Sequence, residues 1–169
     1  MRAKKFTAAV VMAAIAAIGF APLANAAVRP TTAQKLQLQY LIEEEKLARD
    51  VYLYLAANVT TSKFSNIAKS EQTHMDQIAA VLKTYNYFNP TTTRAPGVFR
   101  DKSLQALYNT LIAQGSTDVA AAFQVGRDIE NLDIKDLQVM LKAAMPADMK
   151  LALDNLLKGS YNHLAAFNR

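Results

Sequence analysis

The sequence predicts an all-α protein whose helices pack as a bundle. Apolar residues recur every three or four positions over four long segments, which is the period of an α-helix. No segment of useful length alternates apolar and polar residues as a half-buried strand does. The connection between the first two segments is short, which favours antiparallel neighbours. We therefore expect four main helices and one or two short extra helices.

The first two helices have clear limits in the sequence. Thr31 or Thr32 can cap the first helix, which ends before a polar break at residues 58–62. The second helix ends near Tyr85. Residues 86–102 contain Asn-Pro and Ala-Pro-Gly turn sequences, so we expect the main loop there.

The second half of the chain contains the remaining helices. A short helix is closed by Gly115, and Ser116 or Thr117 can cap the helix that follows. The sequence leaves open whether residues 134–144 continue that helix or form a separate one. Pro146 is expected at the first position of the last helix.

The N-terminus has the pattern of a secretory signal peptide at residues 1–26. A basic start precedes an apolar stretch and the small-x-small cleavage site Ala24-Asn25-Ala26. The apolar stretch is short for a bilayer span, so we expect cleavage and a periplasmic or secreted protein; the alternative is an uncleaved membrane anchor. The expected mature chain has a short tether at residues 27–35 and a helical domain at residues 36–169.

Composition excludes several functional classes. The chain has no cysteine, which excludes disulfides, thiolate metal sites and cysteine nucleophiles, so any metal must be held by oxygen and imidazole ligands. Cleavage removes three of 19 basic side chains and lowers the formal net charge from +5 to +2, so no nucleic-acid partner is expected. No stable membrane span is expected after cleavage. No arrangement of serine, histidine and acid indicates a hydrolase.

The most informative residues are polar side chains that fall on the apolar stripes of the helices. Glu45 occupies a core position in the first helix, whereas its neighbours Glu43 and Glu44 are expected to face solvent, although Glu44 borders the inner face. Burying a lone carboxylate requires a partner cation, a metal ion or a raised pKa. Tyr52 lies two turns from Glu45 on the same stripe, where its hydroxyl can hydrogen-bond a ligand.

The later helices repeat this pattern. Glu71 and His74 lie three residues apart on the inner stripe of the second helix, and His163 lies on the stripe of the last. Glu130 lies on or beside the inner face of the helix between them, close to Gly126, which indicates close packing. An inward Glu-x-x-His pair is a metal-ligating arrangement in helical bundles.

These motifs together resemble the ferritin-like proteins of the rubrerythrin type, and more closely an uncharacterised family of small, often secreted prokaryotic proteins assigned that fold. The similarity extends from Leu36 to the C-terminus. Four segments carry it: Glu45-Lys-Leu-Ala-Arg-Asp-Val-Tyr52, Phe64-Ser-Asn-Ile-Ala-Lys-Ser-Glu71-Gln-Thr-His74-Met75, Val125-Gly126-Arg-Asp-Ile-Glu130-Asn-Leu-Asp-Ile-Lys-Asp-Leu137 and Gly159-Ser-Tyr-Asn-His163-Leu-Ala-Ala-Phe167.

The resemblance implies a ferritin-like four-helix bundle and a carboxylate-bridged pair of iron ions. The implied metal ligands are Glu45, Glu71, His74, Glu130 and His163. The sequence departs from the pattern at Ser160, where a complete site has a second bridging glutamate, and at Arg127, where related sequences can carry another glutamate. By analogy, such bundles often form homodimers.

Two functional hypotheses follow. In the first, the protein binds one or two ions of iron or manganese and supports redox chemistry with peroxide or oxygen, using an external reductant because the chain has no cysteine. In the second, it is a metal-free helical module for binding or scaffolding in the cell envelope. There Arg127 would neutralise Glu130 or Glu71, and Ser160 would hydrogen-bond His163.

Overall fold

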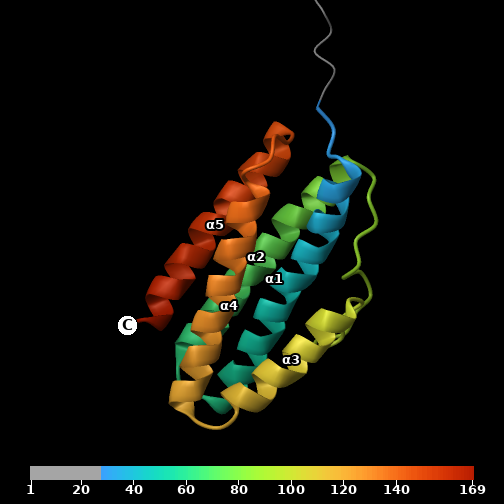
Figure 1. The fold of residues 1–169 in the computed structure, drawn as a ribbon. Coiled ribbons are helices and arrows are strands. Elements are labelled where there is room, and N and C mark those ends of the chain that lie inside the picture. The colour runs from blue at the N-terminus through green and yellow to red at the C-terminus, as the bar shows by residue number, and fades with distance from the viewer. Residues whose placement is uncertain (1–27) are drawn as a thin grey trace, which may run out of the picture.

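The computed structural model describes residues 28–169, and within them all the regular secondary structure is helical (Figure 1). The predicted signal peptide at residues 1–26 lies outside the described residues. The described part contains five helices and no strand. They are α1 (Thr32–Asn58), α2 (Ser62–Thr84), α3 (Lys102–Gly115), α4 (Val119–Met140) and α5 (Ala147–Phe167).

Four long helices pack side by side, and the shorter α3 lies across one side of them. In Figure 1, α1 descends, α2 returns beside it, and α4 and α5 form a second antiparallel pair. Helix α1 contacts α2, α3 and α4, while α5 contacts α2 and α4. The interior is therefore enclosed by α1, α2, α4 and α5, and α3 covers the outer side of α1 and α4.

The helix limits agree with the expected ones at the start of the chain and differ further on. Thr31 caps α1 in a capping box with Gln34. Asp118, rather than Ser116 or Thr117, caps α4 by accepting a 2.8 Å hydrogen bond from the amide of Ala121. Ser116 instead closes α3, because its hydroxyl donates to a carbonyl oxygen of that helix.

Two further points concern the end of the chain. Helix α4 continues without a break through Ile134 to Met140, so residues 134–144 do not form a separate helix. Pro146 is the N-cap residue of α5, one position before the helix begins. Its extended backbone and missing amide donor suit that position as well as the first helical one.

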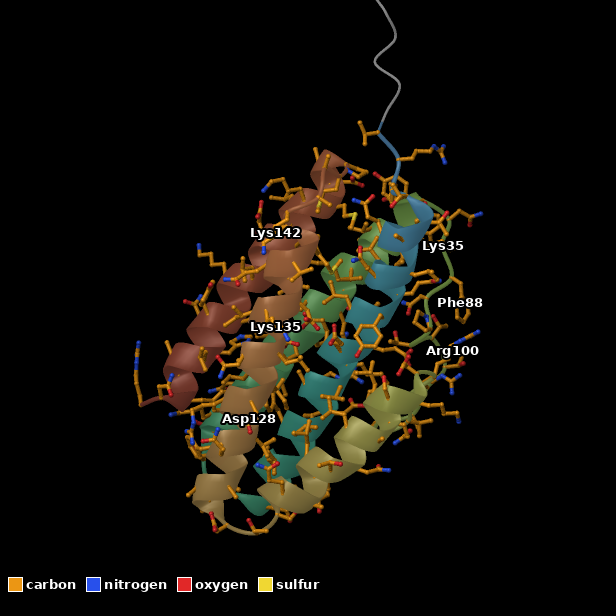
Figure 2. The ribbon with its side chains drawn as sticks, viewed as in Figure 1. Lys35, Phe88, Arg100, Asp128, Lys135 and Lys142 are labelled. Carbon is orange, nitrogen blue, oxygen red and sulfur yellow. The ribbon has the colours of Figure 1, made fainter. Side chains whose placement is uncertain are left out.

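Charged side chains cover the outer surface of the molecule. Figure 2 shows Lys35, Asp128, Lys135 and Lys142 projecting from α1, α4 and the turn after α4. Within residues 28–169, no helix combines the length and the apolar character needed to cross a membrane.

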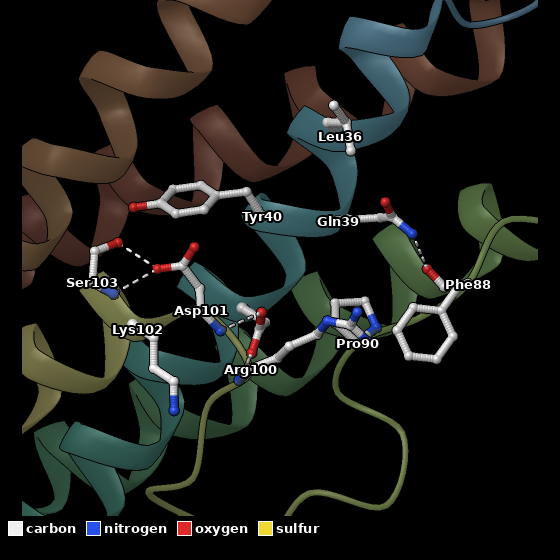
Figure 3. A pocket seen from close by; sticks show the side chains of 10 residues that line it. Leu36, Gln39, Tyr40, Phe88, Pro90, Arg100, Asp101, Lys102 and Ser103 are labelled. Carbon is white, nitrogen blue, oxygen red and sulfur yellow. Dashed lines mark hydrogen bonds between the residues drawn. The ribbon is translucent and has the colours of Figure 1, made fainter.

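The sequence-based prediction that Glu43 and Glu44 face solvent is wrong, because each is only 3% exposed. The loop between α2 and α3 crosses the outer side of α1 and covers it. The carboxylate of Glu43 accepts hydrogen bonds from the amides of Arg100 and Asp101 (Figure 3). Helix α1 is therefore enclosed on both sides, which no pattern within its own sequence indicates.

A buried ion pair fastens the same loop to α1. Lys46 and Asp50 form a salt bridge inside the molecule, and Arg49 also binds Asp50. Lys46 donates a 2.9 Å hydrogen bond to the carbonyl of Ala95, and Asp50 accepts a 2.8 Å bond from the amide of Gly97. These bonds satisfy buried charges with loop backbone groups, so the loop is held in one position.

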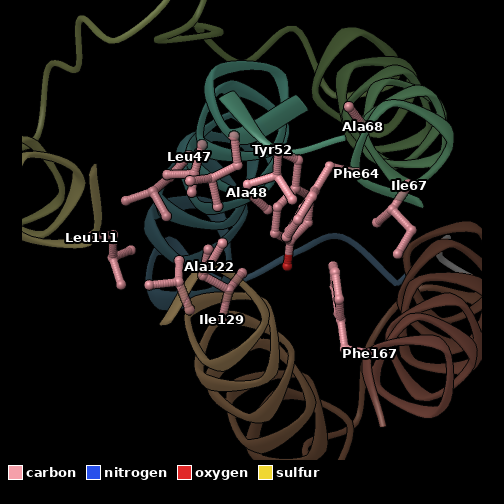
Figure 4. Packing of buried hydrophobic residues seen from close by; sticks show 14 of the residues in the cluster. Leu47, Ala48, Tyr52, Phe64, Ile67, Ala68, Leu111, Ala122, Ile129 and Phe167 are labelled. Atoms are coloured by element: carbon pink, nitrogen blue, oxygen red, sulfur yellow. The ribbon is translucent and has the colours of Figure 1, made fainter. Parts of the chain in front are cut away.

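The apolar core is divided into two clusters along the helices. One cluster contains the aromatic residues Tyr52, Phe64 and Phe167, with ring centroids 5.3–6.1 Å apart (Figure 4). The other lies toward the opposite end of the four long helices and includes Leu41 and Ile78. In every long helix, buried acidic residues or histidines fall between the two clusters, so these side chains form a layer across the middle of the interior.

Close packing at Gly126 is confirmed. A Cβ atom there would lie 2.8 Å from three ring atoms of Phe167. Phe167 is itself enclosed by other rings, so the ring cannot move aside. Glycine lets α5 approach α4 closely next to the polar layer.

Candidate metal centre

The polar layer brings together all five residues singled out by the sequence. Glu45 comes from α1, Glu71 and His74 from α2, Glu130 from α4, and His163 from α5. All five are buried, and Glu45 and Glu130 are completely inaccessible to solvent. Each occupies a position on the inner stripe of its helix, so helical periodicity aims all five side chains at one region.

The five residues form two groups that share Glu71. Glu45, Glu71 and His74 make one group, and Glu71, Glu130 and His163 make the other. In the first group, Nδ1 of His74 lies 2.8 Å from Oε2 of Glu71 and 3.1 Å from Oε2 of Glu45. In the second, Nδ1 of His163 lies 2.8 Å from Oε1 of Glu71 and 3.5 Å from Oε2 of Glu130. Each carboxylate oxygen of Glu71 therefore faces a different histidine.

These separations fit ligand atoms gathered around divalent ions. Metal–ligand bonds of about 2.1 Å place neighbouring ligand atoms about 3.0–3.4 Å apart in octahedral or tetrahedral geometry. The observed range of 2.8–3.5 Å agrees with that spacing. The two imidazole rings are stacked 5.4 Å apart, so the two groups lie next to each other.

Several of the ligand atoms have no hydrogen-bond partner within the protein. They are Oε1 of Glu45, both oxygens of Glu71, Oε2 of Glu130 and Nδ1 of His163. Buried polar atoms are nearly always hydrogen-bonded, and an unpaired one costs about 1–3 kcal/mol. The contacts of Glu71 with both histidines are 2.8 Å long but do not have hydrogen-bond geometry. The residues present therefore fit a metal ion in each group.

Burial and mutual contact shift the protonation of the metal-free cluster. Burial raises the pKa of Glu45 and of Glu130 to about 7. Burial opposes ionisation of Glu71 as well, but the close, positively charged imidazoles of His163 and His74 lower its pKa to about 2. The same carboxylates outweigh the burial of the imidazoles and raise the pKa of His74 to about 10 and that of His163 to about 9. Without metal, the histidines carry protons that partly neutralise the acids.

Neighbouring side chains hold the ligands in place. The hydroxyl of Tyr52 donates a 2.6 Å hydrogen bond to Oε1 of Glu130, which leaves Oε2 directed at His163. The hydrogen bond expected from the sequence between Tyr52 and a predicted ligand is therefore present, with Glu130 as the acceptor. Nε2 of His163 lies 2.9 Å from the hydroxyl of Ser70, so its other nitrogen remains free to face the carboxylates.

The compensating contacts expected for a metal-free core are absent from residues 28–169. Arg127 binds Gln124 and the carbonyl of Phe167 at the surface and reaches neither Glu130 nor Glu71. Ser160 donates to the carbonyl of Leu156 in its own helix and does not bind His163. Both predictions are wrong for a local reason, because each side chain finds a partner close to its own helix.

Two residues of the site were not recognised from the sequence. Asp133 is 2% exposed, lies among the carboxylates of Glu45 and Glu130, and leaves Oδ2 without a partner. Burial raises its pKa well above the ordinary value. Its position three residues after Glu130, on the same helical face, is the signal that could have identified it.

Gly159 is the second residue that was missed. A Cβ atom at Gly159 would lie 2.3 Å from Nε2 of His74 and 2.6 Å from its Cε1. Only glycine at this position of α5 leaves room for the imidazole between α2 and α5. The sequence offers no indication, because the contact joins residues far apart in the chain.

A surface pocket lies apart from this cluster. It measures about 780 Å³ and lies between α1 and the loop before α3, with Tyr40, Arg100, Asp101 and Ser103 along its wall (Figure 3). Asp101 accepts hydrogen bonds from the amide and hydroxyl of Ser103 and caps α3, and the Arg100 amide binds Glu43. These polar groups hold the loop, and the buried cluster remains the stronger functional candidate.

Comparison with known proteins gives matches to proteins that are themselves uncharacterised. The sequence profile of an uncharacterised protein domain, DUF2202, matches residues 34–169. Uncharacterised protein MJ0754 of Methanocaldococcus jannaschii is 44% identical over 127 residues, which cover 75% of this chain and 69% of that protein. The crystal structure of hypothetical protein MJ0754 from Methanococcus jannaschii has a TM-score of 0.79 at 41% identity and covers 82% of this chain and 79% of that one.

Replacing Gly159 should disturb His74 directly. In Gly159→Ala, the new methyl group should push the imidazole away from Glu45 and Glu71, so the pKa of His74 should fall from about 10 toward 6.5. A proton NMR titration of the metal-free protein measures this pKa. Gly115→Ala is the matched control, since its neighbours are Leu55 and Val125 rather than a histidine. An unchanged His74 pKa in Gly159→Ala would show that the glycine does not position the ring.

Proposed function

We propose that this chain, which belongs to the DUF2202 family of uncharacterised domains, is a metal-binding protein that holds a carboxylate-bridged pair of divalent ions between α1, α2, α4 and α5. Glu45, Glu71 and His74 bind one ion, and Glu71, Glu130 and His163 bind the other. Iron and manganese suit this mixture of carboxylate and imidazole ligands.

One observation carries the proposal. Glu71 directs one oxygen toward the group with His74 and the other toward the group with His163, and neither oxygen has a hydrogen-bond partner. A carboxylate that bridges two ions requires that arrangement. A purely structural glutamate, buried to 99%, would be expected to have hydrogen-bonded oxygens.

The arrangement of the four long helices supports a ferritin-like four-helix bundle. Proteins with that fold place glutamates and Glu-x-x-His motifs on facing helices around a pair of metal ions. Here α2 provides the complete motif as Glu71 and His74, whereas α5 provides Ser160 and His163. The second bridging carboxylate of a complete site is therefore missing from α5.

Bound iron or manganese would supply one-electron redox chemistry with peroxide or oxygen at this position. The chain's own residues bind the ions, exclude bulk water and hold Glu130 through Tyr52. Because the chain has no cysteine, electrons must come from an external donor. The metal-free alternative, a binding or scaffolding module, is less well supported because Arg127 and Ser160 do not compensate the buried carboxylates.

Metal binding should stabilise the folded protein. Fe(II) under anaerobic conditions, or Mn(II), at a hundredfold excess over Kd should add about 2.7 kcal/mol per bound ion to the free energy of unfolding and raise Tm by several degrees. His74→Ala should abolish the gain, whereas Asp154→Ala, which removes an exposed carboxylate of α5, should retain it. Thermal melts of the three proteins with and without metal measure the effect. An equal Tm with and without metal in the wild type would refute the metal centre.

Redox chemistry is a separate expectation with its own measurement. The protein loaded with iron or manganese should consume hydrogen peroxide or oxygen when a small-molecule reductant is supplied, and the metal-free protein should not. His74→Ala, treated in the same way, should be inactive because its site lacks a ligand. If the loaded wild type consumes neither oxidant, the protein binds metal for another purpose.

The stability of the metal-free protein should depend on pH in the opposite direction to that of the loaded protein. The folded state holds protons on Glu45 and Glu130, with pKa about 7 against 4.5, and on His163 and His74, with pKa about 9 and 10 against 6.5. The unfolded state therefore binds fewer protons between about pH 5 and 9, so the free energy of unfolding falls as pH rises.

With metal bound, the ligands are already deprotonated, and metal affinity increases with pH because fewer protons must be displaced. Urea denaturation at several pH values between about 5 and 9, in chelator and in metal, tests both trends. A metal-free protein whose stability increases over that range would contradict the assigned protonation.

A further inference from the structure

A row of carboxylates leads from the buried cluster to the surface. Glu130, Asp133 and Asp136 follow one another at intervals of three residues on α4. Each interval advances about 4.5 Å along the helix and turns about 60° around it, so the side chains move gradually from the interior toward α1 and the solvent. Exposure follows the same order, since Glu130 and Asp133 are buried and Asp136 is half-buried.

The outer end of this row opens into a pocket. A pocket of about 360 Å³ lies between α1 and α4, and its wall contains the carboxylates of Glu44 and Asp136 together with Tyr40. Glu44 is the residue before Glu45, a ligand of the proposed centre, so the wall of the pocket and the cluster are one residue apart on α1.

Two of these carboxylates are buried with unpaired oxygens. Oε1 of Glu44 and Oδ2 of Asp133 have no hydrogen-bond partner, although the residues are only 3% and 2% exposed. Glu44 lies beside Asp136, and Asp133 lies among Glu44, Glu45 and Glu130. No lysine or arginine of residues 28–169 forms an ion pair with Glu44, Asp133 or Asp136.

We propose that Asp136, Glu44 and Asp133 form a route of carboxylates along which divalent metal ions pass, one side chain at a time, from the pocket to the buried centre. The inference depends on the proposed metal centre, because the route has no purpose without it. Carboxylates without cationic partners attract a hydrated divalent ion, and those with unpaired oxygens can replace its water ligands one at a time. Steps of about 4.5 Å are short enough for an ion to exchange one carboxylate for the next.

The experiment compares the rates of metal uptake and release with the affinity of the buried centre. Metal-free protein is mixed with Co(II), and binding is followed by visible absorption in a stopped-flow instrument; release is followed after addition of a chelator. Asp136→Asn removes the outermost carboxylate. Asp128→Asn is the matched control, because it makes the same charge change on an exposed residue of α4 that binds Gln124 (Figure 2).

Substituting a residue that only conducts the ion should change the rates of metal uptake and release and leave the affinity of the buried centre unchanged. Uptake and release in Asp136→Asn should both slow by roughly three- to tenfold, with Kd and stoichiometry within about twofold of the wild type. Asp128→Asn should match the wild type in the uptake rate, the release rate, Kd and stoichiometry. Glu44→Gln should slow uptake and release at least as much as Asp136→Asn does. Circular dichroism shows whether each variant is folded.

Three outcomes would overturn the inference, and they are distinguishable. If the wild type binds no Co(II), both the metal centre and the route are wrong. If the wild type binds but Asp136→Asn has the same rates as Asp128→Asn, only the route is wrong. If Asp136→Asn lowers affinity or stoichiometry, Asp136 stabilises the bound ion instead of conducting it.

Discussion

Four of the buried carboxylates, on Glu45, Glu71, Glu130 and Asp133, gather in the polar layer of this small helical protein, and two imidazoles accompany them. Moving an ionised carboxylate out of water costs several kcal/mol unless charge or hydrogen bonds replace its hydration. The metal-free protein meets part of this cost with protons on the histidines and on the more buried acids. The remaining imbalance supports the proposal that divalent cations bind at this site.

The rest of the structure fixes the helices that carry those carboxylates, and so fixes the positions of the carboxylates relative to one another. Apolar clusters on both sides of the polar layer supply the stability that the layer itself lacks. The loop over α1, tied down by Glu43, Lys46 and Asp50, fixes the helix that carries Glu45. Glycines at 126 and 159 allow α5 to approach α4 and α2 closely enough for His163 and His74 to meet the same glutamate.

Helical periodicity was sufficient to predict the parts of this site that depend on one helix at a time. Glu45, Glu71 and His163 each lie on an apolar stripe, and side chains on such stripes necessarily point inward when helices pack. The same rule could have identified Asp133 from its spacing to Glu130. The all-helical class and the starts of α1 and α2 followed from local signals of the same kind.

The sequence could not reveal features that depend on contacts between distant segments. Glu43 is buried because a loop some 50 residues later covers α1, and Glu44 is buried on the side of α1 that faces Asp136 of α4. Nothing near them in the sequence indicates either contact. The contact between Gly159 and His74 likewise joins α5 to α2. The roles expected for Arg127 and Ser160 failed because nearby backbone and side-chain partners satisfied them first.

The bridging role of Glu71 is best tested by anomalous diffraction from crystals of the protein loaded with iron or manganese, with data collected at the absorption edge of the metal. Two anomalous peaks are expected in the interior, on either side of Glu71, one within bonding distance of Glu45 and His74 and the other of Glu130 and His163. A single interior peak would contradict the bridged pair. Peaks confined to exposed carboxylates, or no peak at all, would contradict the metal centre itself.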